Sequence, residues 1–163
     1  MPPAAALWFL PFVAPIALYV AWSDMKSMKI PNKAVLALVA VFAVVGLIAL
    51  PLETYLWRWL HLGVVLAIGF VLASAGLVGA GDAKFAAAMA PFVALGDAVL
   101  FCYLFSMALL AGFATHRAAR RIPALVNALP DWESWHRKKD FPMGLALGGV
   151  LLIYLTLLAL SGA

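Results

Sequence analysis

Long apolar runs alternate with short polar stretches along the whole chain. A helix needs about 20 mostly apolar residues to cross a bilayer. Five runs approach that length, at about residues 4–22, 34–50, 60–78, 98–115 and 142–160. We therefore expect an all-α membrane protein, a bundle of about six transmembrane helices. Five of them come from these long runs, and one further segment is shorter.

The shorter segment covers residues 85–95 and is interrupted by Pro91. It predicts a short fourth helix that ends in a sharp turn at Gly96-Asp97, with a re-entrant segment as the alternative. Residues 52–59 are predicted to form an exit loop ahead of the third span. The small residues at 144–149 are expected to let a neighbouring helix approach the last span closely.

Composition supports the membrane assignment. Hydrophobic residues make up 67% of the chain and charged residues 11%, with a mean hydropathy of +1.07, whereas about a quarter of residues are charged in soluble domains. We expect one membrane-embedded domain over residues 1–163, with the first run retained as a span, because no basic residue precedes it. Cys102 is the only cysteine, so neither a disulfide nor a cysteine-based zinc site is expected.

Lysine and arginine are distributed unevenly between the predicted loops. Lys26, Lys29 and Lys33 follow the first run, and six basic residues lie between positions 117 and 139. Since short basic loops stay in the cytoplasm, both loops are predicted to face it and both termini to lie on the periplasmic side. Arg58 is then the one basic residue that faces outward, and the net charge of +4 reflects topology and anionic lipids rather than nucleic acid.

This topology places two of the seven acidic residues at one depth on the cytoplasmic face. Asp24 follows the first run, and Asp82 opens the fourth segment. The others are assigned to the outer face or to the solvated basic loop: Glu53, Asp97, Asp131, Glu133 and Asp140. An ionisable residue at the end of a membrane segment is costly and points to a functional site.

Two carboxylates in a partly dehydrated site share a proton, so one can act as a base while the other acts as an acid. The ionised group can take a proton from water that attacks a peptide carbonyl, and the protonated group can donate to the oxyanion and the leaving amine. Asp24 and Asp82 are therefore candidates for an aspartic-protease pair. The alternative needs no catalysis: Asp82 caps a helix and Asp24 balances nearby lysines.

The residues beside Asp82 are candidates for substrate contact. Gly79 and Gly81 would let a substrate backbone pass closely and would allow backbone angles that other residues resist. Lys84 either lowers the pKa of its neighbour or extends toward lipid headgroups. Pro31 and Asn32 suit the start of the second helix, since proline loses nothing by lacking an N–H there.

Other polar groups point to no cofactor. His61, His116 and His136 do not have the spacing of metal ligands, so no metal site is expected, and no phosphate-binding loop occurs. The basic loop carries Trp132 and Trp135, which suggests a short amphipathic helix on the lipid headgroups. Docking of a partner or substrate is the alternative for this loop.

Three motifs occur in a fixed order: Asp24 with Ile30-Pro31-Asn32, then Gly79-Ala80-Gly81-Asp82-Ala83-Lys84, then Phe141-Pro142-Met143-Gly144-Leu145-Ala146. Together they resemble the prepilin peptidases, the type IV leader peptidase family, over about residues 15–155. The short chain is most similar to the small members that serve tight-adherence (Flp-type) pili. This resemblance implies a six-span aspartic endopeptidase of the bacterial inner membrane, with Asp24 and Asp82 as its catalytic pair.

The resemblance also implies the substrate. Prepilins and pseudopilins have a short basic leader followed by a hydrophobic helix, and the leader would be cut at the cytoplasmic membrane face. Pro142 and Gly144 would lie near that substrate, although Met143 stands where the family commonly has an aromatic residue. Larger members also carry a cysteine-rich methyltransferase domain, which this chain is not expected to have.

Two functions of other classes fit the composition. A small transporter or channel could use intramembrane acids as a proton or cation path, but it would need acids at several depths. A catalytically idle assembly partner of a pilus or secretion apparatus would keep the fold and cleave nothing.

Overall fold

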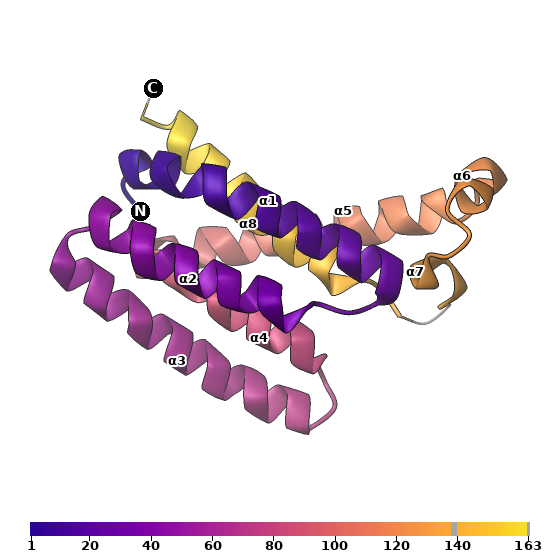
Figure 1. Cartoon of the computed structure of the whole chain (residues 1–163), viewed down its shortest axis with the longest axis horizontal. Coiled ribbons are helices and arrows are strands. Elements are labelled where there is room, and N and C mark those ends of the chain that lie inside the picture. Colours follow the sequence, from indigo (N-terminus) through magenta and orange to yellow (C-terminus); the bar gives the residue numbers. More distant parts are fainter. Residues whose placement is uncertain (138–139, 163) are drawn as a thin grey trace.

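The computed structural model describes residues 1–137 and 140–162, and all regular elements among them are helical (Figure 1). Five stretches are long and apolar enough to cross a membrane. They contain α1 (Pro3–Ser27), α2 (Asn32–Ala49), α3 (Leu52–Ser74), α5 (Ala98–Ala119) and α8 (Met143–Leu160). The shorter helices are α4 (Ala80–Met89), α6 (Pro123–Ala128) and α7 (Glu133–His136). The expected all-α membrane bundle is confirmed, and the ten-residue α4 takes the place of a sixth span.

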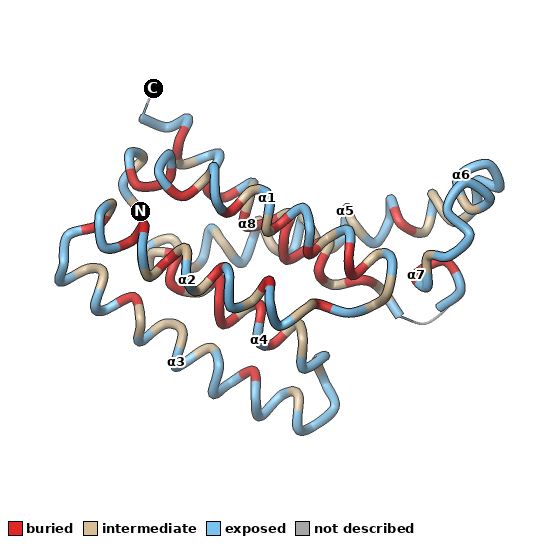
Figure 2. The backbone as a smooth tube through the Cα atoms, in the orientation of Figure 1, coloured by how far each residue is buried: buried red, intermediate tan, exposed pale blue. Residues whose placement is uncertain are grey.

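The centre of the bundle is the pair α1 and α8, which pack along one another (Figure 1). A Cβ atom added to Gly148 would lie 2.6 Å from the carbonyl oxygen of Ala17, so only glycine permits this approach of the two backbones. The predicted role of small residues at the start of the last span is confirmed here. Buried positions therefore concentrate on α1 and α8, whereas α3 and α5 are largely exposed (Figure 2).

Two further helix pairs surround this centre. The short α4 packs along α3, and α5 packs along α8. Inside the bundle the rings of Phe9 and Phe42 lie 4.9 and 5.4 Å from the ring of Phe92, both in edge-to-face arrangements. Because lipid tails are as apolar as these side chains, van der Waals packing rather than exclusion of water holds such a core together.

The sharp turn predicted between the fourth and fifth segments is confirmed. Two 3₁₀ turns, Ala90–Phe92 and Leu95–Asp97, connect α4 to α5. The carboxylate of Asp97 accepts hydrogen bonds from the Tyr154 hydroxyl at 2.7 Å and from the Met1 amine at 2.8 Å. The turn is thereby fastened to α8 and to the start of the chain.

The predicted exit loop at residues 52–59 is wrong, because α3 already begins at Leu52, after Pro51 in the N-cap position. Glu53 in the first turn suits the positive end of the helix dipole. Arg58 lies within this helix, near the turn before α5, and the side of the membrane expected for it stays a prediction. Its side chain is buried, and one guanidinium nitrogen donates to the carbonyl of Pro91 at 2.9 Å.

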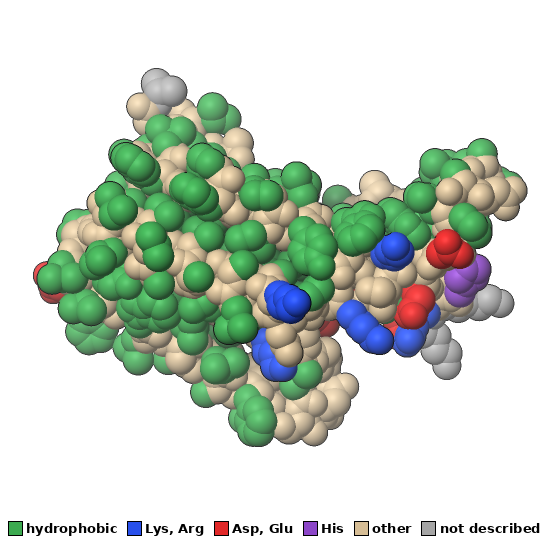
Figure 3. All heavy atoms as spheres, in the orientation of Figure 1, with side chains coloured by type: hydrophobic (Ala, Val, Ile, Leu, Met, Phe, Trp, Pro, Cys, Tyr) green, Lys and Arg blue, Asp and Glu red, His purple; other side chains and the backbone are tan. Residues whose placement is uncertain are grey.

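Charged side chains gather toward one end of the molecule, whereas the rest of the visible surface is mainly hydrophobic (Figure 3). At this end α1 and α5 finish and α4 and α8 begin. We call it the basic end, and we call the opposite end, where the turn before α5 lies, the Asp97 end. The sidedness agrees with the lysine and arginine pattern of the sequence, and the two aspartates of interest both belong to the basic end.

Candidate active site

Asp24 lies in the last turn of α1 and is 5% exposed. One carboxylate oxygen accepts a hydrogen bond of 2.6 Å from the backbone N–H of Gly144, in the first turn of α8. The first N–H groups of a helix have no partner within it and carry partial positive charge. The carboxylate of Asp24 is therefore held at the amino end of a helix that lies 120 residues further along the chain.

Gly144 is needed for this contact. A Cβ atom at this position would lie 2.8 Å from the Cβ of Asp24 and 3.1 Å from its carboxylate oxygen. Real Cβ atoms essentially never come within 3.0 Å of another heavy atom. The glycine after Pro142 thus allows the end of α1 to meet the start of α8 directly.

Asp82 is the third residue of α4, which begins after Gly79 in the N-cap position. Its carboxylate accepts a backbone hydrogen bond from Gly79, which is one half of a capping box. Asp82 is therefore not itself the N-cap. Burial raises its pKa to about 6, the charge of Asp24 adds to this effect, and the Gly79 hydrogen bond opposes it.

The glycines near Asp82 serve close approach rather than unusual backbone angles. A Cβ atom on Gly79 would lie 2.5 Å from a carboxylate oxygen of Asp82, and its φ is −65°. Gly81 lies within helix α4. The glycine with a positive φ is Gly76, at +73° in the preceding turn. The expectation that Gly79 and Gly81 supply conformational freedom is wrong.

The loop after α1 meets the start of α4. Pro31 is the N-cap of α2, as the helix-start pattern predicts, and Asn32 is its first residue. The side chain of Lys84 donates to the side-chain oxygen of Asn32 at 3.3 Å. A Cβ atom on Gly81 would lie in ordinary contact with Ile30, at 3.5 Å. The first two motifs are thus joined through these contacts.

The third motif completes the arrangement, because Pro142 is the N-cap of α8 and Gly144 follows it by two residues. All three motifs therefore meet at the basic end. Each of the two carboxylates accepts a backbone N–H at the start of a helix, Asp24 from α8 and Asp82 from α4. Because the charge of one raises the pKa of the other, the pair is suited to holding one proton between them.

Two supporting groups were not predicted from the sequence. Ser23 is buried, and its hydroxyl donates to the carbonyl of Lys29 at 3.0 Å, which ties the loop to the turn that carries Asp24. Trp135 of α7 is buried and stacks on His116, with ring centroids 5.3 Å apart. The expectation that Trp135 lies on the lipid headgroups is wrong, because it packs inward where α7 approaches α1.

Comparison with known proteins identifies the family. The model of the type IV leader peptidase family matches residues 11–115, which is more than half of the chain and includes Asp24 and Asp82. No curated protein and no solved structure matches the chain. On the strength of the family match, this chain belongs to the type IV leader peptidase family.

Proposed function

We propose that this protein is a membrane aspartic endopeptidase that removes the short basic leader from type IV prepilins or pseudopilins. The observation that carries the proposal is that Asp24 and Asp82, two carboxylates from distant parts of the chain, lie at one end of the bundle, each held by a backbone N–H at the start of a helix. Membership of a leader peptidase family makes a prepilin-type protein the corresponding substrate.

In the proposed reaction the pair carries one proton. The ionised carboxylate takes a proton from a water molecule as its oxygen attacks the scissile carbonyl, and the protonated carboxylate donates to the developing oxyanion. The tetrahedral intermediate then collapses: the now ionised carboxylate takes a proton back from a hydroxyl group of the gem-diol, the C–N bond breaks, and the other carboxyl group gives its proton to the leaving amine. One water molecule is consumed, and the carboxylates end with one proton between them, as they began.

The other proposed site residues position this pair. Gly79 and Gly144 supply the N–H groups that orient the two carboxylates. Gly81 and Pro31 bring the loop after α1 close to α4. Lys84, Asn32 and Pro142 lie beside them and would contact the substrate near the scissile bond.

We place the site at the cytoplasmic face of the bacterial inner membrane. Support comes from the basic residues that gather at the same end of the molecule (Figure 3), because basic loops stay in the cytoplasm. A prepilin presents its basic leader on that side, and its hydrophobic helix would lie in the bilayer.

The direct test is cleavage of a prepilin by purified variants in detergent or vesicles. Asp24→Asn and Asp82→Asn should each lower the rate by about 10²- to 10⁴-fold, the usual contribution of a general acid or base. Asp97→Asn, a matched change at the opposite end, should leave the rate within about twofold of the unmodified protein, since a carboxylate outside the site contributes no general acid–base catalysis. Full cleavage by a folded Asp24→Asn or Asp82→Asn variant would overturn the proposal.

A further inference from the structure

An apolar groove with a volume of about 620 Å³ opens on the side of the bundle. One wall is α3, with Trp57, His61 and Val64. The opposite wall is α5, with Phe101 and Cys102. The floor comes from α4 and from the turn that follows it.

The groove continues the helix face that carries Asp82. Ala86 and Met89 both line it, and they follow Asp82 by four and seven residues on α4. Residues with these spacings lie on one face of an α-helix. A segment lying in the groove would therefore run along α4 and arrive beside the carboxylate of Asp82 at the basic end.

The groove exists because of the way the helices pair. The α3 helix packs along α4, whereas α5 packs along α8, so α3 and α5 form separate walls. Leu147 of α8 also contributes to the lining. No Lys, Arg, Asp or Glu is among the described residues that line the groove, and four of the lining residues are alanines, at positions 86, 90, 94 and 98. Small residues of this kind let a second helix backbone approach closely in a bilayer.

We propose that this groove binds the hydrophobic helix of the substrate and so presents the leader junction to Asp24 and Asp82. The inference rests on the proposed function and assigns the surface that holds the substrate. Three features favour a helix as occupant: the apolar lining, the small alanine side chains in it, and the continuity of the floor with Asp82. A ten-residue helix such as α4 extends about 15 Å, so the groove fits two to three turns of the substrate helix beyond the scissile bond.

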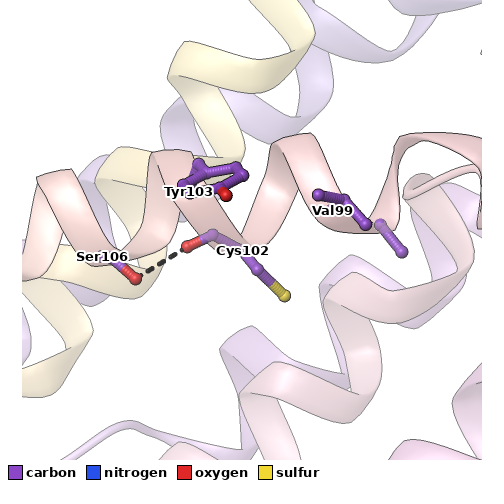
Figure 4. Close-up of a pocket in the computed structure, with 5 residues that line it drawn as sticks. Val99, Cys102, Tyr103 and Ser106 are labelled. Atoms are coloured by element: carbon purple, nitrogen blue, oxygen red, sulfur yellow. Dashed lines mark hydrogen bonds between the residues drawn. The ribbon is translucent and has the colours of Figure 1, made fainter.

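The sole cysteine of the chain offers a built-in probe. Cys102 is exposed, and it lines both this groove and a smaller hollow on α5 beside Val99 and Tyr103 (Figure 4). The hydroxyl of Ser106 donates a hydrogen bond to the backbone carbonyl of Cys102. This bond does not involve the thiol group of Cys102.

The first experiment cross-links Cys102 of the Asp82→Asn variant to a prepilin that carries one cysteine, moved residue by residue through its hydrophobic segment. Cross-linking should peak at positions three or four residues apart, within about four turns after the scissile bond. In the matched control, a Cys102→Ser protein with Met107→Cys moves the thiol to an exposed site outside the groove and should lose this pattern. Uniform cross-linking along the segment, or a Cys102–Cys102 dimer in its place, would overturn the proposal.

The second experiment fills the groove. Cys102→Trp should raise KM for a full prepilin about tenfold, while Met107→Trp should not. A short peptide that spans the leader junction but lacks the hydrophobic helix should be cleaved equally by both variants. An unchanged KM for the full prepilin would mean that the groove holds only lipid and would overturn this inference alone. Failure of the unmodified protein to cleave either substrate would instead overturn the proposed function.

Discussion

The two ends of the molecule hold their buried or half-buried acids in different ways. At the Asp97 end, the carboxylate of Asp97 accepts hydrogen bonds from a hydroxyl and from an ammonium group. At the basic end, Asp24 and Asp82 accept backbone N–H groups at the starts of two helices. A carboxylate bonded to a cation is fixed in its ionised form. Backbone donors orient a carboxylate and still let it exchange a proton with its neighbour, which is what acid–base catalysis requires.

The contacts that hold the helices together also differ between the two ends. The turn before α5 is fastened by Asp97, Tyr154 and Arg58, which link three helices. The site at the basic end depends on two glycines that allow carboxylates to approach backbone. Substitutions should therefore affect stability at one end and catalysis at the other.

Gly144→Ala should have the largest effect among the positioning residues. The added Cβ would collide with the Cβ of Asp24 at 2.8 Å, an atom fixed by the backbone of α1, so the carboxylate must move. A displacement of about 1 Å can lower a catalytic rate about 10²-fold. Gly149→Ala is the matched control in the same helix, because its Cβ would meet nothing within 4 Å. Equal cleavage rates for the two variants would break the proposed link between α8 and Asp24.

Gly79→Ala should have a smaller effect, roughly tenfold in cleavage rate, since acid–base groups contribute about 10²- to 10⁴-fold in full. The colliding atom is a carboxylate oxygen of Asp82 at 2.5 Å, and a side-chain end can rotate away. Gly63→Ala on α3 is the control, since its Cβ would also meet nothing within 4 Å. A Gly79→Ala protein as active as the Gly63→Ala protein would show that Asp82 does not depend on this close approach.

Asp97→Asn should have the smallest effect on cleavage and should act on stability instead. The change removes the negative charge that the Tyr154 hydroxyl and the Met1 amine bond to, and a loss of roughly 1 kcal/mol in unfolding free energy is expected, since hydrogen bonds to charged groups contribute more than those to neutral acceptors. Thermal unfolding of the purified protein in detergent measures this loss. A variant that unfolds like the unmodified protein and cleaves poorly would reverse the assignment of the two ends.

The sequence predicts the helices well because crossing a membrane is a local property of an apolar run. It also predicts the turn before α5, where Pro91 and Gly96 interrupt such a run. The start of α3 was missed because Glu53 and Arg58 look like loop residues. Arg58 is accommodated within the helix by the Pro91 carbonyl, a partner 33 residues away that no local pattern contains.

The candidate site likewise has one part that the sequence predicts and one part that depends on how the helices pack. Topology alone placed Asp24 and Asp82 at one end, and the family resemblance supplied Gly144 and Pro142. The bond from Gly144 to Asp24 joins residues 120 positions apart, so it follows from helix packing rather than from spacing. The inward stacking of Trp135 on His116 likewise depends on where α7 meets α5, and the composition of the loop pointed to the lipid surface instead.

The central claim is that Asp24 and Asp82 act as one proton-sharing pair, and a pH titration of the Asp82 carboxyl group by infrared spectroscopy tests it most directly. In the unmodified protein this group should titrate at about 6, with cleavage falling as the pH rises and the shared proton is lost. In Asp24→Asn, which removes the neighbouring negative charge, the pKa of Asp82 should fall, yet burial should keep it above the ordinary value of 3.8. An Asp82 pKa that is the same in both proteins would show that the two carboxylates do not interact and would contradict the account.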